Sequence, residues 1–173
     1  DQVAGVPGES TCTDCHGNGV NSGAGKVELT LLNATNWTPG QQLRIRITLT
    51  DPAARRWGFE LTARKAGTPA TSAGTFAITD ANARVVSNAP SGLPYATHTT
   101  VGTRSGNPGP TTWEVLWTPP ANVDFGNVTF YVAGNAANNN GQNDAGDRVY
   151  TTNLTVAPAN AGGATTTKVL PQF

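Results

Sequence analysis

The stretch Leu43-Arg44-Ile45-Arg46-Ile47-Thr48-Leu49-Thr50 places an aliphatic side chain at every second position, with Arg or Thr between. Successive side chains of a β-strand point to opposite faces of a sheet, so this alternation predicts a strand with one buried face and one solvated face. An amphipathic helix would instead need apolar residues at a period of 3.6. The stretch therefore predicts a sheet that packs on one side.

The same two-residue period recurs along the chain, and turn signals such as Thr38-Pro39-Gly40 and Asn107-Pro108-Gly109-Pro110 lie between the runs. No segment has a convincing helical period. About eight or nine short strands predict an all-β fold, an antiparallel immunoglobulin-like β-sandwich, with a closed barrel as the alternative. Trp113 and Trp117 are in phase with Val115, which indicates core packing. The further runs are Val27–Leu31, Phe59–Ala63, Phe76–Ile78, Val128–Val132 and Val149–Val156.

The composition divides the chain into three parts. Residues 1–26 form a Gly-rich segment with both Cys, residues 27–157 form the sandwich, and residues 158–173 read as a linker and C-terminal tail. The chain has 11 basic and 11 acidic residues, so it has no basic face for nucleic acid. No apolar run reaches the roughly 18 residues of a membrane span. The uncharged, Thr- and Asn-rich composition favours export, with Asp1 as a mature N-terminus.

The segment Thr11-Cys12-Thr13-Asp14-Cys15-His16 contains Cys-x-x-Cys-His, the attachment pattern of c-type haem. Two thiols at this spacing can each form a thioether with a haem vinyl group, and the adjoining His then ligates the iron. We therefore expect one haem c per chain, bound through Cys12, Cys15 and His16. The alternatives are a Cys12–Cys15 disulfide with an incidental His, or a zinc site, which would need four ligands.

The second axial ligand follows from what the chain lacks. Met is absent, which excludes His/Met ligation, and His98 is the only other His. We therefore predict bis-His ligation of the haem iron by His16 and His98. The alternatives are a surface His98 with an open iron, or ligation by Lys26, by the amine of Asp1 or by a neighbouring chain. Trp57, next to Gly58, is the Trp we expect nearest the haem.

A second candidate site is the loop from Asn135 to Asp147. Its oxygen-bearing side chains surround a Gly in a way that resembles a calcium loop, with Asn138, Asn140, Asp144 and Asp147 as candidate ligands. A solvated Asn/Gly loop is the alternative. No nucleophile elbow or phosphate-binding loop is present, so we expect no catalytic residues and no enzyme activity.

Several segments resemble bacterial secreted domains of the choice-of-anchor V type, which are related to the reeler domain. The resemblance covers about residues 5 to 157. It implies an exported β-sandwich, and it puts the Cys-x-x-Cys-His and Thr97-His98-Thr99 in one recurring set, which supports His98 as a haem partner. The segments that carry it are Gly5–His16, Trp57–Ala63, Thr97–Thr99, Trp113–Pro120, Gly126–Tyr131 and Gly146–Thr151.

We therefore expect an exported mono-haem c-type cytochrome that transfers electrons at the cell surface or outside the cell, with the periplasm as second choice. Its partners would be redox proteins or copies of itself. The weakly charged surface permits self-association into a filament, in which the N-terminal arm and the tail from Thr165 to Phe173 could pair with a sheet edge. The alternative function is a structural filament or adhesive surface subunit, in which the haem, a disulfide or zinc is mainly structural.

Overall fold

The computed structural model describes residues 2–17, 19–87, 92–144 and 146–159, so most of the predicted C-terminal tail lies outside the described residues. The strands form two antiparallel sheets. The first has the order β1 (Lys26–Leu31), β2 (Leu43–Thr50), β8 (Thr111–Thr118), β5 (Thr75–Ile78). The second has the order β10 (Arg148–Val156), β9 (Val128–Ala137), β3 (Arg56–Lys65), β7 (Tyr95–His98), β6 (Ala83–Val86), and β4 (Thr68–Ser72) pairs with β3.

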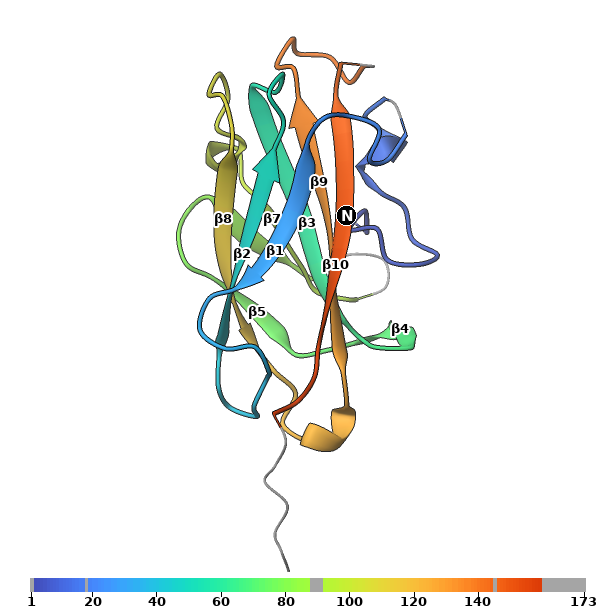
Figure 1. Cartoon of the computed structure of the whole chain (residues 1–173), viewed down its shortest axis with the longest axis vertical. Helices are drawn as coiled ribbons and strands as arrows, with labels where there is room; N and C mark the ends of the chain where they lie inside the picture. The colour runs from blue at the N-terminus through green and yellow to red at the C-terminus, as the bar shows by residue number, and fades with distance from the viewer. Residues whose placement is uncertain (1, 18, 88–91, 145, 160–173) are drawn as a thin grey trace, which may run out of the picture.

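The two sheets pack face to face, and the core lies between them (Figure 1). The four aliphatic side chains of β2 are at most 1% exposed, as its alternation predicts, and Trp113 and Trp117 join them from β8. The antiparallel β-sandwich is therefore confirmed, and the sheets do not close into a barrel. The only helices in the described ranges are the 3₁₀ turns η1 (Cys12–Asp14), η2 (Val101–Thr103) and η3 (Val123–Phe125).

Strand β3 departs from the one-sided pattern, because both of its faces are buried. Its odd-numbered side chains from Trp57 to Ala63 belong to the core between the sheets. Its other face is polar and would be solvated in a plain two-layer sandwich. Here the N-terminal segment covers that face. The covered side of the strand carries Gly58, Glu60, Thr62 and Arg64.

The N-terminal arm, residues 2–25, lies outside the two layers and beside β10 in Figure 1. Ala4 and Val6 pack against Tyr95 of β7 in a small second apolar cluster. The Val3 N–H donates a hydrogen bond of 2.7 Å to Oε2 of Glu60 on β3. These contacts make the arm a third layer over the six-stranded sheet.

A buried arginine holds the middle of the arm in place. Arg64 is fully buried, and its Nη2 donates to the Tyr95 hydroxyl at 2.6 Å and to Oε1 of Glu9 at 3.2 Å. The Tyr95 hydroxyl donates to Oε2 of Glu9 at 2.7 Å. The guanidinium also lies 5.0 Å from the centre of the Tyr95 ring. Because a buried charge needs a partner, this three-residue network ties the arm to β3 and β7.

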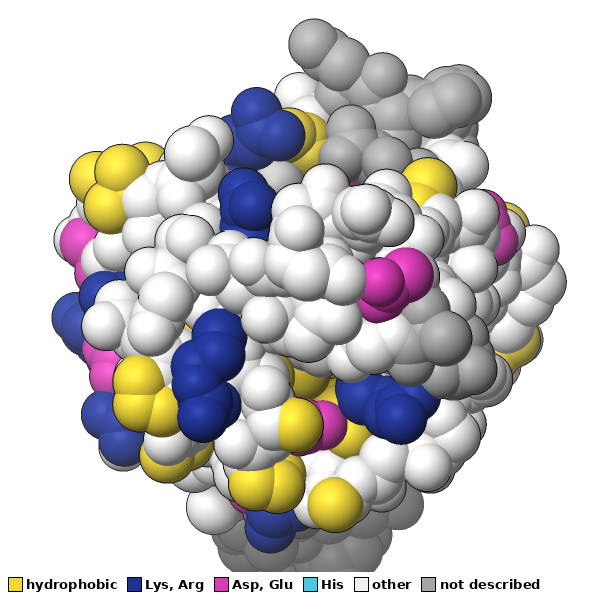
Figure 2. All heavy atoms as spheres, turned by 90° about the horizontal axis from the view of Figure 1, so that it is seen from above, with side chains coloured by type: hydrophobic (Ala, Val, Ile, Leu, Met, Phe, Trp, Pro, Cys, Tyr) yellow, Lys and Arg dark blue, Asp and Glu magenta, His cyan; other side chains and the backbone are white. Residues whose placement is uncertain are grey.

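The surface carries few charges. On the face seen in Figure 2, uncharged surface separates most of the Lys and Arg side chains, and some at the left edge adjoin acidic side chains. Among the described residues, the exposed large apolar side chains are Val20, Leu32, Ile78, Val85 and Val101. Within the described ranges, no helix has the length and hydropathy needed to cross a membrane.

Candidate functional site

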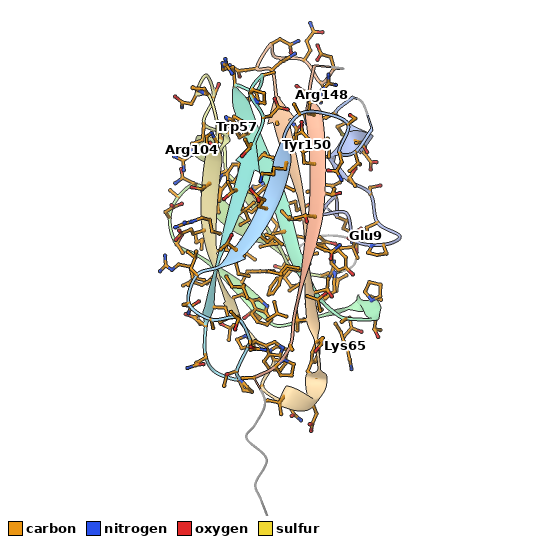
Figure 3. The ribbon with its side chains drawn as sticks, viewed as in Figure 1. Glu9, Trp57, Lys65, Arg104, Arg148 and Tyr150 are labelled. Carbon is orange, nitrogen blue, oxygen red and sulfur yellow. The ribbon has the colours of Figure 1, made fainter. Side chains whose placement is uncertain are left out.

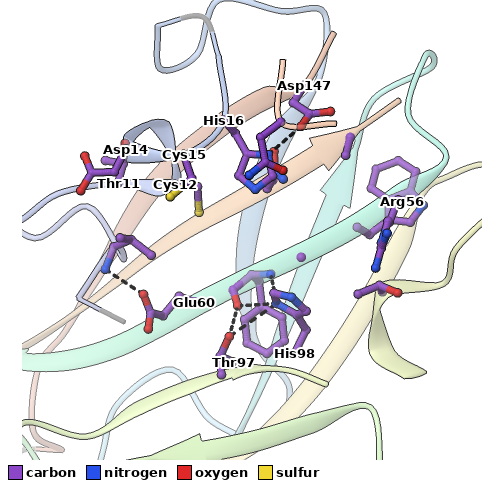
Figure 4. A pocket seen from close by; sticks show the side chains of 18 of the residues that line it. Thr11, Cys12, Asp14, Cys15, His16, Arg56, Glu60, Thr97, His98 and Asp147 are labelled. Atoms are coloured by element: carbon purple, nitrogen blue, oxygen red, sulfur yellow. Dashed lines mark hydrogen bonds and ion pairs between the residues drawn. The ribbon is translucent and has the colours of Figure 1, made fainter. Parts of the chain in front are cut away.

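A pocket of about 500 Å³ lies between the N-terminal arm and the outer face of the six-stranded sheet. Cys12, Cys15 and His16 line it from the arm, and His98 lines it from the end of β7 (Figure 4). The four residues predicted to bind haem therefore share one pocket, although 82 positions separate His98 from His16. The pocket lies toward the Trp57 end of β3, opposite the Lys65 end in Figure 3.

The Cys-x-x-Cys-His motif is folded as a single turn. The Thr11 side chain caps η1 by accepting from the Thr13 N–H at 3.2 Å, and the His16 N–H donates to the Cys12 carbonyl at 3.0 Å. Residues three and four positions apart lie on the same side of such a turn. This geometry explains why Cys12, Cys15 and His16 all face the pocket.

The two thiols differ in their surroundings. Both are free, so the alternative disulfide is not formed in the structure. Burial, with a smaller contribution from the negative charge of Glu60, raises the pKa of the Cys12 thiol to about 12. Cys15 is exposed. The thiol of Cys12 is therefore neutral at physiological pH.

His16 is oriented by a buried carboxylate. Its Nδ1 lies 2.6 Å from Oδ2 of Asp147, whose side chain is 1% exposed. The other oxygen of Asp147 accepts from the Asn138 N–H at 3.2 Å. A carboxylate on Nδ1 favours the tautomer whose Nε2 carries a lone pair, an arrangement common among metal-ligating histidines. Among the described residues, Nε2 of His16 has no hydrogen-bond partner.

His98 is the last residue of β7, and its side chain lies beside the backbone of β3. The β3–β7 ladder pairs only Glu60 with Thr97 and Leu61 with Ala96, and the His98 ring then meets the Phe59 backbone. Its Nδ1 lies 3.0 Å from the Phe59 nitrogen and 3.1 Å from the Phe59 oxygen. A metal at Nε2 requires the tautomer with a proton on Nδ1, which donates to the Phe59 carbonyl.

Gly58 makes room for this ring. A Cβ atom on Gly58 would lie 2.7 Å from Cε1 of His98, closer than real Cβ contacts allow. Burial is the main cause that lowers the pKa of His98, and the positive charges of Arg84 and Arg56 add to it, against a hydrogen bond to Phe59 that raises it. His98 is therefore neutral at physiological pH, as a metal ligand must be.

Glu60 contributes a buried carboxyl to the wall of the pocket. It is 3% exposed, and its Oε1 has no hydrogen-bond partner among the described residues. Burial raises the pKa of Glu60, although the bond from the Val3 N–H partly offsets this. The carboxyl therefore titrates at a higher pH than an exposed Glu and lies close enough to influence Cys12.

The four predicted calcium ligands have hydrogen-bond partners within the described residues. Asp144 accepts from the side-chain amides of Asn138 and Asn140, at 3.3 and 2.6 Å, while Asp147 is turned to His16. These hydrogen bonds hold the loop in shape, and calcium binding stays a prediction. In the part of the chain that the structure describes, no three His, Cys, Asp or Glu side chains are gathered to hold a metal ion by themselves.

The remaining candidates have different positions. Trp57 belongs to the core, but it also lines the pocket, and its Nε1 donates to the Asn107 carbonyl. Lys26 does not line the pocket and pairs with Glu28 at 2.9 Å. The amine of Asp1 lies outside the described residues. His98 is therefore the second His that lines this pocket, and its role as a ligand stays a prediction.

Sequence reasoning missed four residues of the site: Asp147 as the partner of His16, Glu60, and Arg56 and Arg84 at the rim. Arg56, Glu60 and Arg84 come to the pocket by strand pairing in the six-stranded sheet, and Asp147, in the connection between β9 and β10, meets His16 where the arm docks. The available signal was the polar alternate row of β3, which includes Arg56, Gly58 and Glu60 and would have suggested a functional face.

Comparison with known proteins agrees with the fold. The chain covers 94% of the human F-spondin reeler domain crystal structure at 20% identity, over 82% of its own length, with a TM-score of 0.57. A DUF4466 family protein from Parabacteroides merdae is more distant, at 12% identity and a TM-score of 0.41, with 79% of this chain and 44% of that chain covered. No curated protein sequence matches significantly. Residues 10–136, most of the chain, match the Reeler domain, a β-sandwich of extracellular proteins, and the chain therefore belongs to the Reeler domain family.

Proposed function

We propose that this protein is an exported mono-haem c-type cytochrome, in which Cys12 and Cys15 bind the porphyrin covalently and His16 and His98 ligate its iron. The observation that carries the proposal is the shared pocket of the two thiols and two imidazoles. In both histidines Nδ1 has a partner and Nε2 does not, among the described residues. A haem needs only axial ligands from the protein, because the porphyrin supplies the others.

The covalent step is an addition. The S–H of each thiol adds across a vinyl C=C bond, so that sulfur bonds to one carbon and the hydrogen goes to the other. No electron acceptor is needed, because nothing is oxidised overall. The bound haem then supplies a one-electron Fe³⁺/Fe²⁺ couple. The chain's own contribution is to hold both axial imidazoles and to leave the iron no open position, which favours electron transfer over oxygen chemistry.

An extracellular location is part of the proposal. Membership of the Reeler family, which occurs in extracellular proteins, supports it. So does the low share of charged residues, 13% against roughly 25% in an ordinary soluble domain.

Replacing His98 tests the ligand assignment. In haem-loaded protein, His98→Ala should convert a low-spin absorption spectrum to a high-spin one, and added imidazole should restore the low-spin spectrum. Thr112→Ala, on the outer face of the other sheet, is the control and should leave the spectrum unchanged. A low-spin spectrum that survives His98→Ala without imidazole would exclude His98 as the ligand.

A further inference from the structure

A second, smaller pocket of about 330 Å³ adjoins the main one on the side away from the cysteines. Arg56, Arg84, His98 and Thr103 line both pockets, and Thr99 and Thr100 complete the second. The two guanidinium groups belong to β3 and β6, which β7 separates in the sheet. Both positive charges act on His98, where they help to lower its pKa, so both lie near its ring.

Neither arginine has an acidic partner in the part of the chain that the structure describes. Three other arginines of the sheets do: Arg44 and Arg46 share Glu114, and Arg64 pairs with Glu9. Two cations that converge on one pocket repel each other unless an anion lies between them. Guanidinium groups bind carboxylates best, through paired N–H···O bonds.

The acidic and basic side chains of β3 that line the pocket lie at different ends of it, which favours one orientation of a bound haem. Glu60 lies close to Cys12, and Arg56 lies four residues earlier on the same face, about 13 Å along the strand. Arg84 lies two strands across from Glu60, with Thr97 between them, about 10 Å away. Figure 4 shows the cysteines and Glu60 at one end, Arg56 at the other, and His16 and His98 between them.

We infer that Arg56 and Arg84 form a subsite for the two propionate carboxylates of the haem. The inference rests on the proposed function. The vinyl edge of the porphyrin would meet Cys12 and Cys15, and the carboxylate edge would point away from Glu60 toward the second pocket, which both arginines line. The reverse orientation would bring carboxylates toward a buried acid and leave both guanidinium groups without an anion. The arginines act as positioning residues, because they touch the carboxylates and not the iron.

The test is the reduction potential of haem-loaded protein between pH 5 and pH 8. Both side chains are exposed, so Gln can replace them without opening the core. In the double variant Arg56→Gln/Arg84→Gln, the potential should fall at pH 8, because lost positive charge disfavours the reduced iron. It should also rise as the pH falls, because the unpaired carboxylates then titrate in this range. The wild-type potential should stay nearly constant.

Two further variants make the result specific. Arg55→Gln is the matched control, because Arg55 is exposed, bonds to the carbonyls of Pro52 and Ala54 and lines neither pocket, so its potential should match the wild type. Arg56→Lys keeps the charge without the paired bonds and should lie between wild type and Arg56→Gln. Haem-loaded Gln variants with wild-type potentials at every pH would overturn the subsite and leave the cytochrome intact. Wild-type protein that carries no haem would overturn the proposed function itself.

Discussion

Gly58 and His98 show how one residue without a side chain can create a ligand position. The His98 ring occupies the space that a Cβ of residue 58 would need, and its Nδ1 lies within hydrogen-bond distance of both the N–H and the carbonyl of Phe59. The opposite ligand, His16, is oriented by the buried Asp147. The positions of the two imidazoles therefore depend on two neighbours: Gly58, which leaves space for the His98 ring, and Asp147, which bonds to Nδ1 of His16.

Gly58→Ala tests this arrangement without removing any ligand. The added methyl group must displace the His98 ring, so the haem-loaded variant should lose most of its low-spin spectrum and about 1–3 kcal/mol of stability. Gly19→Ala is the matched control, since a Cβ there meets nothing within 4 Å and the residue also belongs to the arm. Absorption spectra and thermal melts give both quantities. Equal spectra in the two variants would mean that the Gly58 space is not needed.

The two thiols should differ in reactivity before haem is attached. With a pKa of about 12, only about one Cys12 thiol in ten thousand is ionised at pH 8, while Cys15 is exposed. We expect iodoacetamide to modify Cys15 of the haem-free folded protein much faster than Cys12, and denaturant to equalise the two rates. Peptide mapping by mass spectrometry measures this. Equal rates in the folded protein would show that the Cys12 thiol is not shielded from solvent.

At the scale of the elements, alternation of apolar and polar residues predicts a strand correctly where only one face of that strand is buried. β2 and β8 were predicted from it, and so was the placement of Trp113 and Trp117. β4 and β6 were not predicted, because short strands with few buried side chains lack a periodic apolar signal. The cover over the polar face of β3 was missed for a related reason: Glu60 and Arg64 read as solvated until the arm is docked on them.

The site was readable in part, for similar reasons. Cys-x-x-Cys-His is a local pattern, so the sequence carries it whole, and His98 followed from the lack of any other His or Met. Arg56 and Arg84 were not assigned to the site, because strand pairing brings them there, and Asp147 was not, because it meets His16 only when the arm docks. Asp147 was instead predicted for calcium, because its loop spacing was all that the sequence offered.

The outer face of the four-stranded sheet carries a small pH-dependent contribution to stability. Glu114 lies opposite Arg46 and bonds to it at 2.7 Å and to Arg44 at 2.9 Å, and these arginines lower its pKa. Because the folded-state pKa lies below the unfolded value, the stabilisation is full above pH 4.3 or so and is lost as the pH falls through the folded-state pKa.

Glu114→Gln should therefore destabilise the protein by about 0.2–1 kcal/mol at pH 7, as expected for a largely exposed pair, and by less as the pH approaches 3. Urea melts at both pH values measure the difference. Glu28→Gln is the control, because its pair with Lys26 is more exposed and should contribute less. A penalty for Glu114→Gln that is the same at both pH values would contradict the assignment to ion pairing.

At the scale of the whole molecule, the arm brings the Cys-x-x-Cys-His motif against the sandwich, so the pocket exists only when three layers are assembled. The protein has no net charge and few charged residues, so little repulsion opposes association between copies. The sheets end in the edge strands β1, β5, β6 and β10; Asn21 of the arm bonds to part of the β10 edge, and the edges of β1, β5 and β6 are where a further strand could pair.

Self-association follows as a prediction from these features. The purified haem-loaded protein should form oligomers or filaments that increase with protein concentration and change little between low and high salt, because few charges are involved. Sedimentation velocity and electron microscopy measure this. A strictly monomeric protein at every concentration would argue for a diffusing electron carrier and against a filament subunit.

The central claim is covalent haem at Cys12 and Cys15, and the mass of the denatured protein tests it most directly. Protein matured in a host that attaches c-type haem should carry the mass of one haem after denaturation, and a Cys12→Ala/Cys15→Ala variant should not. The native protein should show a Soret band and the α and β bands of low-spin haem. Correctly matured protein whose mass equals that of the polypeptide alone would contradict the account.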